Sequence, residues 1–362
     1  MDTSRDMPAR MGFMIIAACI VVIIAGMKAA SGIIVPFLLS IFIAVICGGP
    51  FSWLIRKRVP SVLAVVIIIA CVIAVLLGLG AYMGASVNSF LLEIPQYQTR
   101  IEDEFIRFIF WLRGFGINIS QRVVMDFFDP ASIMQIIANI LSGLGGVLTN
   151  TFLILFTVVF ILMESSTFLS KIKSAFRVSA HTLETFDFIF TCVGRYLAIK
   201  TWVSLATGIS VMVWLMIIGV SYPVLWGLVA FLLHYIPNIG SLIAAIPAIL
   251  FAMVDVNVGT AVLAAGGYAL VNLVFGNILE PIFMGRGLSL STLVVFLSLI
   301  FWGWVLGPVG MLLSAPLTMI FKIAFESFPS TRWVAILLDS EVALPLDMPP
   351  AGTKSPAGTS RT

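Results

Sequence analysis

Long apolar runs set the strongest limit on what this chain can fold into. Several of them extend for about 20 residues with almost no charge, the length at which a helix crosses a bilayer core of about 30 Å. Over the whole chain, 60% of the residues are hydrophobic and 10% are charged, whereas about 25% are charged in soluble domains. No water-soluble fold could bury that much apolar surface. The sequence therefore predicts an all-α, polytopic integral membrane protein whose main partner is the lipid bilayer.

Charge and cysteine usage exclude several other classes of protein. The formal net charge is +3 and the basic residues are scattered, so a nucleic-acid-binding protein is excluded. The four cysteines lie in or beside apolar runs without CxxC spacing, which argues against disulfides and a metal site. The chain also lacks the HExxH and GxSxG motifs of hydrolytic enzymes. We predict no catalytic residue, no metal and no cofactor.

Apolar and polar segments alternate in a clear order. Residues 1–86 are expected to hold three spans, at about 11–30, 31–54 and 61–86. After them we expect an extramembrane helical insert at 87–145, a fourth span at 146–164, a cytoplasmic amphipathic segment at 165–200, a transport core at 201–325 that begins with a span at about 201–219, and a tail at 326–362 that is disordered after about residue 345.

The insert at 87–145 carries an amphipathic stripe. Its apolar members recur at helical spacing: Tyr97, Ile101, Phe105, Phe108 and Leu112. Two readings stay open. The insert is either a small helical cap on the membrane domain, or a surface that binds a partner or lies at the membrane interface.

The distribution of basic residues predicts the orientation in the membrane. If the N-terminus is cytoplasmic, most of the 20 Lys and Arg residues lie inside, including the Arg56-Lys57-Arg58 triplet. We therefore expect a multi-pass protein of the bacterial inner membrane with both termini in the cytoplasm.

The apolar runs after Ser221 are too short to cross a bilayer. The arms 224–236 and 241–253 are about 13 residues long, or roughly 20 Å each as helices. They flank a Pro237-Asn238-Ile239-Gly240 turn. The pattern predicts a re-entrant hairpin whose turn is buried in protein or faces a wet cavity.

A second hairpin follows a full span at about 258–279. Its arms, 288–302 and 309–323, flank a turn-rich stretch that ends in Gly307-Pro308. The sequence after Pro237 resembles that after Pro308, since each has a glycine (Gly240 or Gly310), aliphatic and small residues, and a second proline. The prediction is six full spans plus two hairpins, or eight spans if the hairpins are counted as spans.

The spans that precede the two hairpins run in opposite directions, so the hairpins are expected to enter from opposite sides. Inverted repeats with broken helices are typical of secondary transporters. The alternative is that Pro and Gly simply kink packed helices. We interpret the pair as a transport core for a small polar solute or for a monovalent cation and protons.

Polar residues at membrane depth mark the candidate site, because they are costly in hydrocarbon. Glu280 is either a proton or cation ligand or a boundary acid paired with Arg286, and Asn272 and Asn277 lie on broadly the same side of its helix. His234 either binds the substrate or bonds to a carbonyl, and Asn238 either satisfies the turn or contacts the substrate. The full candidate set is His234, Pro237, Asn238, Gly240, Asn272, Asn277, Glu280, Arg286, Gly307, Pro308 and Gly310.

These motifs resemble the autoinducer-2 exporter family of bacterial inner-membrane transporters. The likeness covers about residues 11–330, and it depends on the following motifs: Ile236-Pro237-Asn238-Ile239-Gly240-Ser241, Asn277-Ile278-Leu279-Glu280-Pro281, Met284-Gly285-Arg286 and Gly307-Pro308-Val309-Gly310. The resemblance implies a transporter that exports autoinducer-2, or alternatively a sodium/proton antiporter. Together with the large apolar faces it also implies a homo-oligomer. A non-transporting scaffold is the third reading.

Overall fold

The computed structural model describes residues 6–82, 84–86, 89, 151–176, 180–237, 239–284, 290–327 and 331–339. Within these ranges the protein is helical, and its one β feature is an isolated bridge between Leu290 and Asp339. The expected all-α class is confirmed. The predicted insert at 87–145 lies outside the described residues, apart from Ser89.

Five helices are long and apolar enough to cross a membrane. They are Ser31–Arg56, Ser61–Ser86, Phe188–Ile217, Val258–Met284 and Thr292–Glu326, and four shorter apolar helices accompany them: Met14–Ala29, Thr151–Glu164, Pro223–Leu233 and Gly240–Asp255. This finding agrees with a multi-pass membrane protein.

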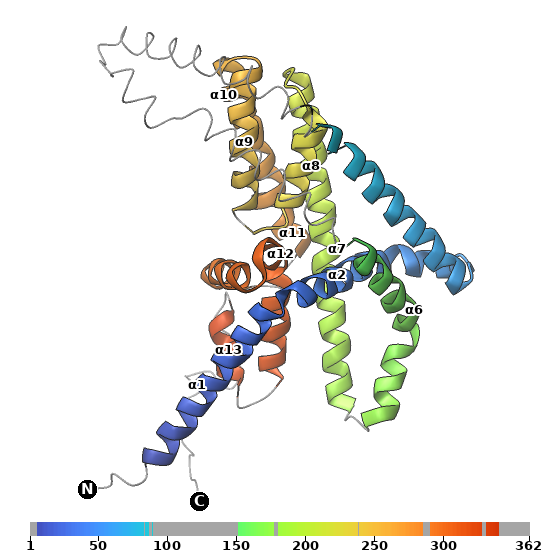
Figure 1. The fold of residues 1–362 in the computed structure, drawn as a ribbon, viewed down its shortest axis with the longest axis vertical. Helices are drawn as coiled ribbons and strands as arrows, with labels where there is room; N and C mark the ends of the chain where they lie inside the picture. The colour runs from blue at the N-terminus through green and yellow to red at the C-terminus, as the bar shows by residue number, and fades with distance from the viewer. Residues whose placement is uncertain are drawn as a thin grey trace, which may run out of the picture.

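The N-terminal helices α1 (Asp6–Ala29) and α2 (Ser31–Arg56) follow one another with Ala30 alone between them. Figure 1 shows them as a bent rod, an arrangement that the division into spans 11–30 and 31–54 did not anticipate. The helical hydrogen bonds continue across the junction, since Ile34 N donates to Ala30 O at 3.0 Å.

Helix α6 (Thr151–Phe176) packs against α2, and α7 (Ala180–Ile217) follows it. Helix α7 runs without interruption through Thr201, where the sequence predicted the fifth span to begin. It ends at Ile217, and Gly219 follows with a φ of 79°, which suits a glycine beyond a helix C-terminus. Pro223 then opens α8 (Pro223–Leu233) at a position where its missing N–H costs nothing.

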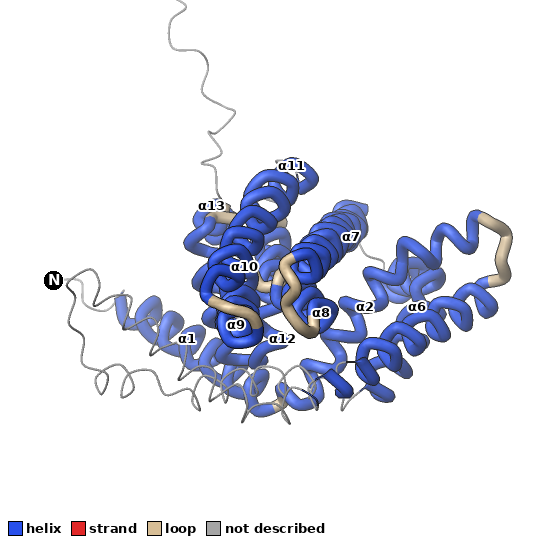
Figure 2. The backbone as a smooth tube through the Cα atoms, turned by 90° about the horizontal axis from the view of Figure 1, so that it is seen from above, coloured by secondary structure: helices blue, strands red, loops and turns tan. Residues whose placement is uncertain are grey.

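Helices α8 and α9 (Gly240–Asp255) form a helical hairpin. Gly240 packs so closely on the turn that a Cβ there would overlap the carbonyl oxygen of Leu233, and farther from the turn Trp226 contacts Phe251 with ring centroids 5.4 Å apart. Helix α10 (Val258–Val271) follows, with Asn257 as its N-cap accepting from Thr260 N at 2.8 Å. In Figure 2, α7, α8, α9 and α10 stand together as one group.

Helix α12 (Thr292–Glu326) is also a hairpin, because Gly307 breaks it with a φ of 71°. Its arms pack antiparallel, since Trp302 lies opposite Gly310 near the tip and, farther from the tip, Ser298 Oγ and Thr318 Oγ1 share a hydrogen bond at 2.5 Å. A Cβ at Gly310 would overlap Trp302 O, as one at Gly240 would overlap Leu233 O. Helical hairpins are therefore present at both predicted positions, each with a closely packed glycine at its tip, and their re-entrant course in a membrane stays a prediction.

The C-terminal helix α13 (Arg332–Leu338) packs on α12. Lys322 Nζ lies 2.9 Å from Asp339 Oδ2, and Ser291 N donates to Leu338 O at 3.1 Å. These contacts hold the start of the predicted tail against the open end of the second hairpin.

Candidate functional site: a buried ion pair between three helices

The long helix that follows α9 changes its winding as it approaches the site. After α10 it becomes a π-helix, η2 (Asn272–Leu279), and then the short α11 (Glu280–Met284). Such π segments are rare and occur frequently at functional sites. Pro281 lacks a backbone N–H, so it cannot donate the next helical hydrogen bond. This irregular backbone presents Glu280 to α7 and α8.

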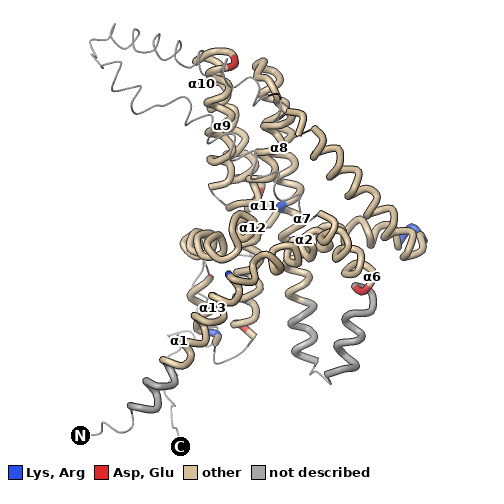
Figure 3. The backbone as a smooth tube through the Cα atoms, in the orientation of Figure 1, with Lys and Arg blue, Asp and Glu red and all other residues tan. Residues whose placement is uncertain are grey.

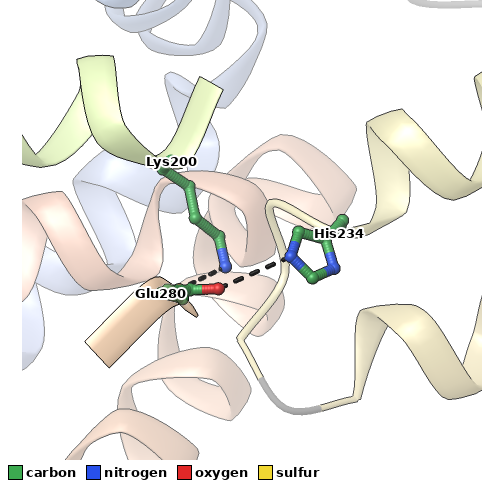
Figure 4. A network of polar contacts seen from close by, with 3 residues as sticks. All are labelled: Lys200, His234 and Glu280. Atoms are coloured by element: carbon green, nitrogen blue, oxygen red, sulfur yellow. Dashed lines mark hydrogen bonds and ion pairs between the residues drawn. The ribbon is translucent and has the colours of Figure 1, made fainter. Parts of the chain in front are cut away.

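Three ionisable side chains from three helices meet at this point (Figure 4). Lys200 Nζ, from the middle of α7, lies 2.6 Å from Glu280 Oε1. His234, immediately after α8, places Nε2 at 3.5 Å from Glu280 Oε2. The side chains are mostly shielded, with 4% of Lys200, 5% of His234 and 17% of Glu280 exposed.

The two contacts of Glu280 differ in strength. At 2.6 Å the Lys200 contact is a charge-assisted hydrogen bond. At 3.5 Å the His234 contact is too long for a good hydrogen bond, and His234 Nε2 has no hydrogen-bond partner among the described residues. The site thus contains a neutralised carboxylate and a buried imidazole whose contact with that carboxylate is long.

Asn272 and Gly276 of η2 lie beside the imidazole. A Cβ at Gly276 would lie 2.9 Å from Asn272 Oδ1 and 3.7 Å from His234 Cε1. The absent side chain at Gly276 therefore leaves room for both polar groups.

The first hairpin tip is held next to the ion pair by Tyr235. Its hydroxyl donates to Thr201 Oγ1 of α7 at 2.8 Å, and its ring packs edge-on against Phe42 of α2 at 5.5 Å. Because Thr201 follows Lys200 directly, the same turn of α7 fixes both the tip and the ammonium group.

Charged residues are otherwise sparse along the described helices. Figure 3 shows a basic and an acidic position together in the interior of the molecule beside α11. Since a charge inside a membrane protein is costly, a buried pair there indicates a functional role.

The structure brings together some of the residues predicted from the sequence and separates others. His234, Asn272 and Glu280 lie in or beside the cluster, and Pro237 and Gly240 form the adjoining hairpin tip. Asn277 is exposed. Gly307, Pro308 and Gly310 lie at the second hairpin tip, where Val309 packs in a separate cluster with α2 and α6.

Asn238 and Arg286 lie outside the described residues, and so does the predicted pair of Glu280 with Arg286. Lys200 was missed as a site residue because it stands at the end of a basic segment and was grouped with it. The available signal was its position in the apolar stretch from Leu197 to Leu205, where a single lysine needs a partner.

Comparison with known proteins identifies the family. The AI-2E family transporter model matches residues 17–330. The chain is 42% identical to the AI-2 transport protein TqsA of Escherichia coli K12, over 90% of this chain and 94% of TqsA. It is 40% identical to a putative transport protein of Haemophilus influenzae, over 89% and 94% of the two chains, and 34% identical to the putative transport protein YhhT of Escherichia coli K12, over 93% and 97%. The resemblance found in the hairpin motifs is thus confirmed: the chain belongs to the AI-2E transporter family of multi-pass membrane proteins.

Proposed function

We propose that this protein is a secondary transporter that exports a small polar molecule across the bacterial inner membrane, with both termini in the cytoplasm. Lys200, His234 and Glu280 form its solute site. The observation that carries the proposal is the buried contact of these three side chains where α8 ends and the α10 helix becomes irregular. Helices interrupted beside a polar site are the usual construction of transporters.

The charge of the cluster favours a polar solute over a metal cation. Lys200 already neutralises Glu280 at 2.6 Å, so a bare cation would have to displace the ammonium group to reach the carboxylate. A hydroxyl group of a solute could instead donate to Glu280 Oε2, and a second hydroxyl could bond to His234 Nε2, while the ion pair stays intact. The relative TqsA of this protein is named as an AI-2 transport protein, so autoinducer-2 is the first solute to test.

The two helical hairpins supply a route for alternating access. Each is tightly closed at a glycine, Gly240 or Gly310, so each can move as a unit. In this proposal the hairpins re-enter the membrane from opposite sides, and exchange of their positions exposes the site first to the cytoplasm and then to the outside.

The test is solute uptake by inside-out vesicles that contain the purified protein. Wild-type vesicles are expected to accumulate autoinducer-2, because export from the cell is uptake in this orientation. The Glu280→Gln variant is expected to lose at least about tenfold in uptake, since a hydrogen bond to a charged group contributes about 1.5–3 kcal/mol. Glu326→Gln removes an exposed acid at the end of α12 and serves as the matched control, with unchanged uptake.

Equal uptake by Glu280→Gln and wild type would contradict the assigned site. A pH-sensitive dye enclosed in the same vesicles tests for antiport. A dye response to a sodium gradient, without accumulation of any polar solute, would overturn export and support sodium/proton exchange.

A further inference from the structure

Four buried polar groups on helices α7, α8 and α10 lack a hydrogen-bond partner among the described residues. They are the hydroxyls of Ser204, Thr207 and Tyr268 and the indole N–H of Trp226. Ser204 and Trp226 are 0% exposed, Thr207 4% and Tyr268 6%. An unpaired buried polar group costs about 1–3 kcal/mol, so four in neighbouring helices require a physical reason.

Two of the groups continue the polar face of α7 from Lys200. Thr207 lies about two helical turns after Lys200 and about two turns before Trp214. Lys200 contacts Glu280, and Trp214 Nε1 donates to Leu263 O of α10 at 2.9 Å. Thr207 therefore faces the helix formed by α10 and η2.

Ser204 belongs to the side of α7 that faces α8. It lies between Thr201, which bonds to Tyr235, and Gly208, which packs against Gly227 so closely that a Cβ would lie 2.7 Å from Gly227 O. Helices α7 and α8 are therefore in near backbone contact next to Ser204.

The other two groups extend from the facing helices into the same interior. Trp226 of α8 and Tyr268 of α10 belong to one buried cluster with Val211 of α7. Tyr268 is one helical turn before Asn272, the η2 residue whose Oδ1 lies with His234 beside Gly276. The four polar groups thus come from α7 and from α8 and α10, which both pack on α7, and together they are called the interior strip.

We propose that Ser204, Thr207, Trp226 and Tyr268 line the passage by which the solute moves between Glu280 and the end of the molecule near Ser221. This inference rests on the proposed function and extends it to a second part of the route. The strip offers hydroxyls that donate and accept and an N–H that donates, but no charge. It fits an uncharged solute with several hydrogen-bonding groups, together with water, because a charged solute would lose its counter-charge after leaving Lys200 and Glu280.

Cysteine labelling tests the passage without depending on transport. The four native cysteines are replaced by alanine, and S204C and T207C are introduced separately. The reagent is a small, charged methanethiosulfonate added to vesicles. The matched control is S40C, since Ser40 is also 0% exposed but its hydroxyl donates to Pro36 O at 2.7 Å and to Ile154 O at 3.2 Å. We expect S204C and T207C to react and S40C to remain unlabelled.

A second variant gives a readout from transport itself. Tyr268→Phe removes a hydroxyl that has no partner within the described ranges, so thermal stability is expected to stay the same or to rise. The KM for uptake is expected to rise by about threefold to tenfold, the effect of one lost neutral hydrogen bond.

Absence of labelling at both positions, or an unchanged KM in Tyr268→Phe, would overturn the passage. Failure of the proposed function would look different, because wild-type vesicles would then accumulate no solute while S204C and T207C still reacted.

Discussion

Lys200 and Glu280 show how two charged residues can be kept inside a chain that is mostly apolar. Each side chain is largely shielded, and each neutralises the other across 2.6 Å. Removing one partner leaves an uncompensated charge, whereas replacing both with neutral residues of similar size is often nearly neutral for stability. At the residue scale, stability therefore requires only that both charges be present or both be absent. The proposed transport requires the charged pair itself.

That difference predicts the outcome of a double-mutant cycle. Lys200→Met and Glu280→Gln are each expected to destabilise the detergent-solubilised protein, by up to about 3–5 kcal/mol, which is the cost of breaking a buried pair. The double variant is expected to recover most of the lost stability because no unpaired charge remains. It is expected to stay inactive in uptake. Thermal unfolding of the four proteins measures the coupling. Strictly additive losses in stability would refute the paired arrangement.

At the scale of elements, the two hairpins depend on glycines at their tips. Gly240 and Gly310 allow the backbone of one arm to touch a carbonyl group of the other arm, Leu233 O or Trp302 O. Gly307 adds a φ of 71°, which L-residues with a side chain rarely adopt. Short arms alone would not fix such turns, so the glycines determine where each hairpin closes.

Alanine at either tip glycine is therefore expected to destabilise the protein. In Gly240→Ala and Gly310→Ala the new methyl group overlaps backbone that cannot rotate away, a cost of at least about 1–3 kcal/mol. Gly266→Ala is the matched control, because nothing lies within 4 Å of its Cβ position inside α10. There alanine gains up to about 1 kcal/mol of helix propensity.

Thermal unfolding in detergent compares these three variants with wild type. Gly240→Ala or Gly310→Ala melting at the same temperature as Gly266→Ala would show that the tips are not closely packed.

At the scale of the whole molecule, the open ends of the two hairpins point to opposite ends of the structure. Figure 1 shows the junction of α9 and α10 at the upper end and α13, which packs on α12, toward the lower end. Asp255 joins the first open end by accepting from Ser221 N at 2.7 Å, and Lys322 joins the second to Asp339. If the long axis crosses the bilayer, these ends lie on different sides of it.

Labelling of intact cells tests this orientation. In a background without the native cysteines, V256C at the first open end is expected to react with a membrane-impermeant maleimide from outside. E326C at the second open end is expected to react only after permeabilisation, since both positions are exposed but face opposite compartments. Labelling of both variants from the same side would exclude opposed hairpins.

Much of this architecture was predictable because it depends on local patterns. Run length fixed the membrane environment, and Pro and Gly at positions such as Pro237, Gly240 and Gly307 marked both hairpins, since turn geometry is encoded in the few residues that make the turn. His234 and Glu280 stood out as polar residues in apolar surroundings, and the motifs around them identified the family.

The tertiary structure decided which of these residues meet. Lys200 and Glu280 are far apart along the chain, and a helix pattern contains no information on which neighbouring helix a side chain will face. The separation of Asn277 from the cluster and the bent α1–α2 rod likewise depend on packing between helices. The sequence by itself determined a membrane protein with two hairpins and a few costly polar residues. Contact between α7, α8 and the irregular end of α10 joined two of those residues, His234 and Glu280, to Lys200 in one site, because a buried charge is stable only where another helix brings its partner.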